Sequence, residues 1–392
     1  MPSADQAWTI LIFLNYEQYL GWFLRAVHNW GSNFMVAIMT LHMIQVFLFG
    51  GFKCPRELTW ITGCVLFLCV LGMAFTGQVL RFDQDAYWGL GIGTAILART
   101  PVLGAPLTAL LLGGPIIAGE TLSRFFTLHV FVVPGLIIAM ISVHLRLVLA
   151  AGINEYPRPG QPVDPATYRD EYEELLKKEG VAFVPHAIGK DLVFAGVLIL
   201  AILACAAWFG PSGPNGPPNP TLIETNPRPD FYFLPLFSVF ALLPAYMETF
   251  LMLTAPAIGV VILFLVPFLS NTGEKSARRR PVAVVGVILI MLTLSVLAWL
   301  GTYSPWSPVM NAWSGAPTPA EMVKGRSPLE LQGAVVLQAK QCRNCHSLGG
   351  QGGLRGPALD AVATEWNRLT DELGRDKQLA AYRASMGLPP KS

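Results

Sequence analysis

Charged residues are scarce in this chain of 392 residues. Asp, Glu, Lys and Arg make up 13% of it, whereas 53% of the residues are hydrophobic and the mean hydropathy is +0.49. This composition excludes an ordinary water-soluble domain and indicates a membrane protein. The first residues lack the basic and apolar regions of a secretory signal, so we expect the spans themselves to direct insertion. The net charge of +2 gives no indication of nucleic-acid binding, and we expect no nucleic-acid partner.

The chain also lacks a disulfide framework. Four of the six cysteines are scattered in or beside apolar runs: Cys54, Cys64, Cys69 and Cys205. The other two belong to the CxxCH pattern formed by Cys342, Cys345 and His346, which is typical of covalent c-type haem attachment. In this pattern the thiols bond the haem and His346 is its proximal ligand. A zinc site would need further Cys or His residues nearby, and none follows.

Met386 is the methionine that follows the CxxCH pattern. It suits a distal thioether ligand of the c-type haem, which would raise the reduction potential. The alternative is a surface or gap-filling methionine near the end of the chain.

Four histidines lie in two apolar stretches at matched spacing. His28 and His42 are 14 residues apart, and His129 and His144 are 15 apart. On a helix, each pair lies near one face, with roughly 21–22 Å between its members. Imidazole is costly in hydrocarbon unless it has a partner. A lone histidine is expected to bond a carbonyl, but two matched pairs predict two stacked haem b groups, each with two axial imidazoles.

The apolar runs predict an all-α, polytopic bundle of about six membrane spans. We expect the spans at residues 28–50, 59–80, 124–150, 190–209, 250–270 and 282–301. Residues 8–24 are expected to form an interfacial helix, and 231–249 an interfacial segment. The connections 81–121, 151–189 and 210–229 are expected to be surface helices, a polar linker and a Pro/Gly-rich loop.

The second span carries Gly63 and Gly77, again 14 residues apart. Glycines at the histidine spacing would let flat macrocycles approach the helix backbone at two depths. Contact with a neighbouring helix is the alternative, because small residues are common at helix interfaces in membranes.

Basic residues predict the orientation of the chain. Lys275 and Arg278–Arg280 lie between the fifth and sixth spans, so we expect this loop on the cytoplasmic side. Both termini and residues 210–249 then face outside. Covalent haem attachment in bacteria also occurs outside the cytoplasm, so the two signals agree. We expect the bacterial cytoplasmic membrane, with the C-terminal domain on the periplasmic side.

Specific motifs make the chain similar to cytochrome b of the quinol–cytochrome c oxidoreductase complexes, with a small α-helical cytochrome c domain fused at its end. They are Leu-Arg-x-x-His at 24–28, the paired histidines, Thr-Leu-Ser-Arg-Phe-Phe-Thr-Leu-His at 121–129, and Pro-Asp-Phe-Tyr at 229–232. The second spacing and the long linker resemble the form split into cytochrome b and subunit IV, here joined. The expected domains are 1–158 (di-haem), 159–309 (subunit IV-like) and 310–392 (cytochrome c).

The resemblance implies a role for each matching residue. His28 with His129 would hold the haem near the outer face, and His42 with His144 the haem near the inner face. Arg25 would pair with a propionate of the outer haem. Asp230 and Tyr232 stand in the place of the family's Pro-Glu-Trp-Tyr motif, and the carboxylate would take a proton from bound quinol. Without the resemblance, Asp230 would be interpreted as a turn residue after proline.

The chain departs from the family at several positions. Leu-Arg-Phe-Asp-Gln at 80–84 stands where the family often has Leu-Pro-Trp-Gly-Gln, and Gln45 stands where it often has a basic residue. Residues 1–27 resemble only the interfacial helix that follows the family's first span, so another subunit or lipid is expected to cover one side of both haem pockets.

The resemblance implies a core subunit of a quinol–cytochrome c reductase. Quinol would be oxidised at the outer face, one electron passing through a Rieske iron–sulfur protein to the c-type haem and the other crossing the two b-type haems to a quinone, with proton translocation. Expected partners are quinol, the Rieske protein, a cytochrome c or oxidase as acceptor, lipid and a second copy of the chain. A di-haem anchor of another dehydrogenase or reductase and a non-catalytic electron-transfer scaffold stay open as alternatives.

Overall fold

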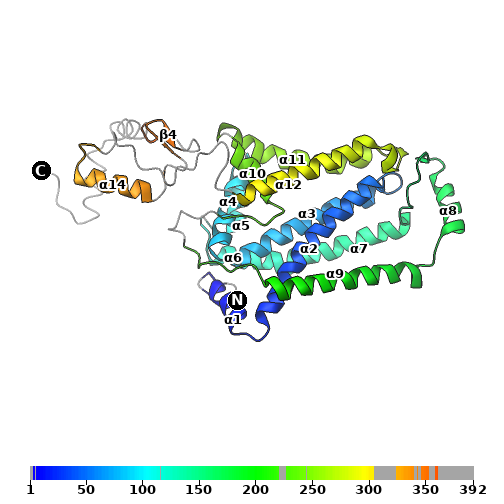
Figure 1. The fold of residues 1–392 in the computed structure, drawn as a ribbon, viewed down its shortest axis with the longest axis horizontal. Coiled ribbons are helices and arrows are strands. Elements are labelled where there is room, and N and C mark those ends of the chain that lie inside the picture. The colour runs from blue at the N-terminus through cyan, green and yellow to red at the C-terminus, as the bar shows by residue number, and fades with distance from the viewer. Residues whose placement is uncertain are drawn as a thin grey trace. The chain divides into compact units, whose positions relative to one another are not determined.

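A computed structural model describes residues 3–4, 6–114, 116–219, 227–243, 245–303, 324–339, 342, 346–352 and 358–360. This part of the chain is mostly α-helical (Figure 1). Six of its helices are long and apolar enough to cross a membrane: Gly21–Leu48, Glu57–Leu80, Gly119–Ala151, Phe183–Phe209, Thr249–Leu269 and Pro281–Tyr303. The expected all-α bundle of about six spans is therefore confirmed.

The chain divides into two compact units. The first comprises Met1–Phe233 and Met252–Ala298, and the second comprises Leu234–Leu251 and Trp299–Ser392. The paired histidines and the Pro-Asp-Phe-Tyr motif belong to the first unit, whereas the CxxCH pattern belongs to the second.

The first two helices meet at a sharp break. Helix α1 covers Ala7–Tyr16 and α2 covers Gly21–Leu48. Leu20 adopts a left-handed backbone conformation with φ of 56°. A Cβ atom at Gly21 would lie 2.0 Å from the Leu14 carbonyl oxygen, so only glycine fits beside this turn. The interfacial helix expected over 8–24 was therefore predicted too long, because residues 21–24 belong to the first span.

Helix α3 (Glu57–Leu80) is the centre of the first unit. It packs against α2, against α7 (Val133–Ala151) and against two shorter helices, α4 (Gln84–Ala98) and α6 (Gly119–Thr127). Helix α2 also packs against α9 (Ile188–Phe209) (Figure 1). Trp60 on α3 donates a hydrogen bond of 2.7 Å to the Leu263 carbonyl, within the part of α11 (Ala245–Leu269) that belongs to the first unit. Phe52, Trp60 and Cys64 form a buried apolar cluster at this contact.

Three short helices follow α3, as expected for residues 81–121: α4 (Gln84–Ala98), α5 (Gly104–Leu112) and α6 (Gly119–Thr127). Their apolar residues Leu90, Leu112 and Phe125 form a buried cluster with Val79 of α3. Asp83 caps α4 by accepting a hydrogen bond of 2.9 Å from the Ala86 backbone. This cluster fixes the end of α3 nearest to Gly77.

A π-helical turn, η1 (Leu128–Val132), joins α6 to α7 and contains His129. A π turn accommodates one extra residue in a helix, and such turns are frequent at functional sites. The extra residue accounts for the difference between the 15-residue spacing of His129 and His144 and the 14-residue spacing of His28 and His42. Both pairs therefore keep their side chains on one helix face.

The loops that were expected on the cytoplasmic side are joined by a two-stranded sheet and a buried charge network. Strand β1 (Pro162–Val163) pairs antiparallel with β2 (Gly273–Glu274), next to η3 (Ala277–Arg279), while α8 (Tyr168–Glu179) lies in the polar linker. Lys275 donates 2.7 Å to Glu155, Tyr168 donates 2.6 Å to the same carboxylate, and Arg56 donates 2.7 Å to the Tyr168 hydroxyl. Burial alone would raise the pKa of Glu155, but these hydrogen bonds lower it below its ordinary value.

We expect Glu155→Gln to destabilise the protein by about 3 kcal/mol, because it leaves the buried Lys275 charge without a counter-ion. The lowered pKa of Glu155 means that its contribution is present at neutral pH and is lost as the pH falls below 4.5. Thermal unfolding in detergent measures both effects. Glu174→Gln is the control, because its ion pair with Lys177 is exposed and is expected to contribute under about 1 kcal/mol. Equal melting temperatures for the two variants would contradict the assignment.

The second unit contains α10 (Leu234–Leu242), the end of α12 (Pro281–Tyr303), α14 (Pro328–Ala339) and a hairpin of β3 (Ser347–Leu348) and β4 (Gln351–Gly352). A Cβ atom at Gly301 would lie 2.8 Å from the Ser238 hydroxyl, so α12 and α10 are in close contact there. The first turn of α14 is capped by Glu330, which accepts a hydrogen bond of 2.8 Å from the Ser327 backbone.

Candidate functional site

The histidine pair that the resemblance assigns to the outer haem consists of His28 on α2 and His129 in η1. The two ring centroids are 6.2 Å apart, and the ring planes are at 88° to each other. Two imidazoles that share one metal ion at bonds of about 2 Å have their centroids about 6 Å apart. The separation therefore fits two imidazoles that would hold one haem iron between them; the assignment of these residues as ligands stays a prediction.

Hydrogen bonds from α3 orient the His129 ring. The Thr76 hydroxyl donates 3.0 Å to the Met73 carbonyl, and the same hydroxyl lies 3.1 Å from Nδ1 of His129. Nδ1 also lies 3.1 Å from the Met73 carbonyl. Because the hydroxyl proton is used on Met73, Nδ1–H is the donor in both contacts. The lone pair of Nε2 is then free for a metal ion.

The second pair, His42 and His144, repeats this arrangement nearer the N-terminal end of α3. Nδ1 of His144 lies 2.9 Å from the Thr62 hydroxyl, which itself donates 3.0 Å to the Thr59 carbonyl. His42 and His144 line one cavity of 480 Å³ together with Gly63. This volume lies in the range of sites for cofactors and small ligands. The residues present thus fit a second haem between α2 and α7.

Gly63 and Gly77 lie against the imidazoles themselves. A Cβ atom at Gly77 would stand 2.6 Å from Cε1 of His129, and one at Gly63 would stand 3.4 Å from Cε1 of His144. The glycines were expected to admit the macrocycles; the structure places them where they admit the ligand rings. Position 77 tolerates no side chain, whereas an added methyl group at 63 makes ordinary van der Waals contact.

Sequence reasoning missed Thr62 and Thr76, the residues that orient the two rings. A Thr-Gly pair occurs at 62–63 and again at 76–77, at the same spacing of 14 as the histidines on α2. This repeat is visible in the sequence, and a metal-bound imidazole generally donates its other N–H to a protein acceptor. The repeated pair is therefore the signal that would have found them.

Asp230 and Tyr232 form a hydrogen-bonded pair in the segment before α10. The Tyr232 hydroxyl donates 2.8 Å to Oδ2 of Asp230. Burial, together with the adjacent carboxylate, raises the pKa of Tyr232, so the phenol stays protonated at neutral pH. Phe233 contacts Tyr232 and also meets Phe75 of α3, with ring centroids 4.9 and 6.4 Å away. These rings attach the pair to the end of α3 that carries Thr76 and Gly77.

Arg25 lies one turn before His28 on α2, but its donors are directed at the 210–219 loop. Nη1 donates 2.7 Å to the Gly213 carbonyl and 2.8 Å to the Asn15 side chain, and Nη2 donates to the Ser212 carbonyl. The predicted contact with a haem propionate therefore has to use the remaining N–H groups of the guanidinium, and it stays a prediction.

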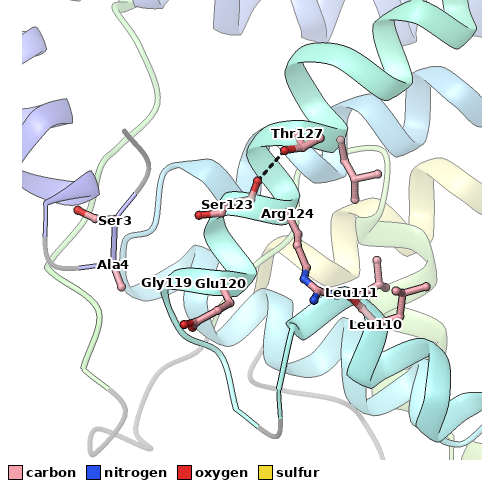
Figure 2. Close-up of a pocket in the computed structure, with 10 residues that line it drawn as sticks. Ser3, Ala4, Leu110, Leu111, Gly119, Glu120, Ser123, Arg124 and Thr127 are labelled. Atoms are coloured by element: carbon pink, nitrogen blue, oxygen red, sulfur yellow. Dashed lines mark hydrogen bonds between the residues drawn. The ribbon is translucent and has the colours of Figure 1, made fainter.

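A second cavity, of 930 Å³, lies beside the first turns of α6 (Figure 2). Its polar residues include Ser123, Arg124 and Thr127 of the predicted 121–129 motif. Thr127 donates 3.0 Å to the Ser123 carbonyl, and Arg124 donates to the Leu110 carbonyl. These bonds stabilise α6 internally and join it to α5, and α6 leads directly into η1, which contains His129.

Only part of the predicted c-type haem site lies in the part of the chain that the structure describes. The His346 backbone N–H donates a hydrogen bond of 3.0 Å to the Cys342 carbonyl, so these two residues of the pattern lie close together. Cys345 and Met386 lie outside the described residues.

Comparison with known families matches the chain from residue 33 to residue 315, which extends from within α2 past the end of α12. Residues 33–221 match the family described as cytochrome b(N-terminal)/b6/petB, and residues 217–315 match cytochrome b(C-terminal)/b6/petD. Cytochrome b6 of Mesostigma viride is 39% identical over 153 residues, covering 39% of this chain and 71% of that protein.

Longer matches extend over three quarters of the chain. Cytochrome b of Cereibacter sphaeroides is 30% identical over 322 residues, covering 76% of this chain and 70% of that protein. The cytochrome bc complex cytochrome b subunit of Chlorobaculum thiosulfatiphilum is 30% identical over 299 residues, covering 75% of this chain and 65% of that protein. Among solved structures, a chain of a hyperthermophilic respiratory Complex III is 27% identical with a TM-score of 0.64. The match covers 88% of this chain and 82% of that chain. The chain therefore belongs to the cytochrome b family, whose members are multi-pass membrane proteins that bind haem b.

Proposed function

We propose that the chain is the core subunit of a membrane quinol–cytochrome c oxidoreductase that oxidises quinol near the outer face. One observation carries the proposal: the Asp230–Tyr232 pair is attached to the same end of α3 that orients His129. A proton acceptor and an electron acceptor are then close together, which quinol oxidation requires. The relative from Chlorobaculum thiosulfatiphilum, a subunit of a cytochrome bc complex, supports this reading.

In this proposal each cofactor has assigned residues. His28 and His129 hold the outer haem b, whose propionate Arg25 contacts; His42 and His144 hold the inner one. Cys342, Cys345 and His346 attach a c-type haem in a cytochrome c domain at 310–392, with Met386 as its distal ligand, after a di-haem domain at 1–158 and a subunit IV-like domain at 159–309. When bound, these haems supply one-electron carriers.

Asp230 and Tyr232 handle the proton from quinol. The protonated phenol of Tyr232 donates a hydrogen bond to Oδ2 of Asp230 and thereby orients the carboxylate. Oδ1 then accepts the proton from a quinol hydroxyl and releases it to water on the outer side. Tyr232 acts here as a fixed donor, because its raised pKa keeps the proton on the phenol.

The proposed setting follows from the same assignment. The chain lies in the bacterial cytoplasmic membrane with the cytochrome c domain on the periplasmic side, and it translocates protons as part of a homodimer. A Rieske iron–sulfur protein accepts the first electron from quinol, and a soluble or membrane cytochrome c or an oxidase is the final acceptor.

Asp230→Asn is expected to slow quinol oxidation by about 10²-fold, because an amide cannot take up the quinol proton. Steady-state reduction of cytochrome c by membranes at neutral pH measures the rate, and b-type spectra confirm that the haems are retained. Asp170→Asn, an exposed change on α8, is the control. Equal rates for Asp230→Asn and the unmodified protein would remove the proton role.

The proposed activity itself is tested by inhibitor-sensitive quinol–cytochrome c reduction in membranes that contain the unmodified chain. We expect reduction that a quinol-site inhibitor abolishes. Absence of this activity, while spectra record both b-type haems, would contradict the proposal and favour the electron-transfer scaffold.

A further inference from the structure

The corner between α3 and α4 holds a buried ion pair that the family's usual residues cannot form. Asp83 has no solvent exposure, and its Oδ2 accepts 2.8 Å from Arg81 and 2.9 Å from the Asn215 backbone N–H. Its Oδ1 accepts 2.9 Å from the Ala86 backbone. Arg81 and Asp83 stand where the family often has proline and glycine, so this arrangement belongs to this chain's own residues.

The partner of the corner is the outer segment, which we define as residues 210–219. In addition to the bond from Asn215 to Asp83, the segment is hydrogen-bonded to Gln84, which both donates to it and accepts from it. The Gln84 backbone N–H donates 2.9 Å to the Gly216 carbonyl, the Gln84 side chain donates 3.2 Å to the Asn219 carbonyl, and the Asn219 backbone donates back to the Gln84 side chain. The outer segment, whose composition predicts only a loop, is therefore hydrogen-bonded to the α3–α4 corner along much of its length.

Gly213 of the outer segment lies directly against the ion pair. Its φ is +59°, and a Cβ atom there would stand 3.1 Å from Oδ2 of Asp83 and 3.2 Å from Cζ of Arg81. The Arg81 guanidinium also donates 3.4 Å to the Ser212 hydroxyl. The segment thus approaches the pair closely with its backbone, which requires glycine.

The α3–α4 corner and the Asp230–Tyr232 pair are attached to the same end of α3. Phe233, which adjoins Tyr232, packs against Phe75 of α3 with ring centroids 6.4 Å apart, and Arg81 follows Leu80, the last residue of this helix. Burial and Asp230 raise the pKa of Tyr232, and the positive charge of Arg81 opposes that rise. The outer segment that the corner fastens precedes the pair in the chain.

We propose that Arg81 and Asp83 are positioning residues of the outer quinol site: their ion pair fastens the outer segment to the α3–α4 corner and so holds the Asp230–Tyr232 pair in place. The inference rests on the proposed function for its effect on quinol, whereas the fastening itself stands on geometry alone. Neither residue takes part in the chemistry; both act through the segment that they hold.

The test compares Asp83→Asn, Arg81→Gln and Arg81→Lys with the unmodified protein in detergent. Hydrogen–deuterium exchange of the peptide that contains Asn215 measures the fastening, and the KM and kcat for quinol measure the positioning. Arg158→Gln is the control, because it breaks an exposed ion pair with Glu179. Spectra of the b-type haems identify any variant that fails to fold.

We expect Asp83→Asn and Arg81→Gln to speed exchange at Asn215 by about 10-fold, since a charge-assisted hydrogen bond is lost. The KM for quinol rises several-fold with a smaller change in kcat, Arg81→Lys restores part of both, and the control changes neither. Unchanged exchange in both variants would overturn the fastening. Faster exchange with an unchanged KM would overturn the positioning role. An unmodified protein without quinol activity would instead refute the proposed function, and the exchange measurement would still decide the fastening.

Discussion

Replacing His129 with alanine is expected to remove the outer haem b and to leave the inner one bound. His129 faces His28 at a centroid separation of 6.2 Å, and α3 offers Thr76 and Met73 to orient its ring. Loss of one of two axial imidazoles leaves His28 alone on the iron. Redox difference spectra of the purified protein should lose about half of the b-type absorbance, because the inner pair keeps its own two ligands.

His186→Ala is the matched control, because this exposed histidine lies in η2 (Phe183–Ala187), outside both pairs. It should keep the full b-type spectrum. The proposed covalent c-type haem, whose CxxCH pattern lies far along the chain, should still stain on a denaturing gel in both variants. An intact stain together with an unchanged b-type spectrum in His129→Ala would refute the assignment of this residue.

Gly77→Ala is expected to remove the same haem although every histidine is still present. The added methyl carbon would stand 2.6 Å from Cε1 of His129, and 3.2 Å from both ring nitrogens. The ring must move away, and the hydrogen bonds from Nδ1 to Thr76 and Met73 are then lost. The helix itself gains stability, because alanine is favoured over glycine inside a helix by about 1 kcal/mol. A loss of haem therefore reports on the ring and not on helix formation.

The control for Gly77→Ala is Gly63→Ala, the equivalent change beside the inner haem. There the methyl carbon would lie 3.4 Å from Cε1 of His144, an ordinary contact. We expect this variant to keep both haems, with at most a shift in the potential of the inner one. Spectral titration of the two variants side by side measures the difference. Equal retention of both haems in the two variants would contradict the close approach at Gly77.

The large features of the fold follow from single-residue properties. Span length is set by bilayer thickness, so long apolar runs located six helices, although the first and fourth begin seven residues earlier than expected. The shared helix face of His28 and His42 follows from their spacing. That of His129 and His144 also depends on the π turn at His129, which is set by how α6 and α7 meet the rest of the bundle. The break at Leu20 is equally a product of packing, since Gly21 must approach the Leu14 carbonyl.

Contacts between distant segments account for what the sequence did not predict. The contact of Arg25 with a haem propionate stays a prediction, but the sequence did not predict the partners that the structure gives this side chain, Asn15 and the carbonyls of Ser212 and Gly213. Backbone carbonyls carry no signature in the sequence, so a long-range partner of this kind cannot be read from residue types. The Thr-Gly repeat is different, because it was visible and needed only the principle that metal-bound imidazoles have a second partner.

The central claim is that opposed imidazoles hold two haems at two depths, between α2 and the continuous helix formed by η1 and α7. Its most direct measurement is the haem content of the purified chain, by pyridine-haem absorbance together with intact mass. The account predicts two extractable haem b groups for each polypeptide, and both histidine pairs are needed to keep that number. One extractable haem or none, in protein that is folded and inserted in the membrane, would contradict it.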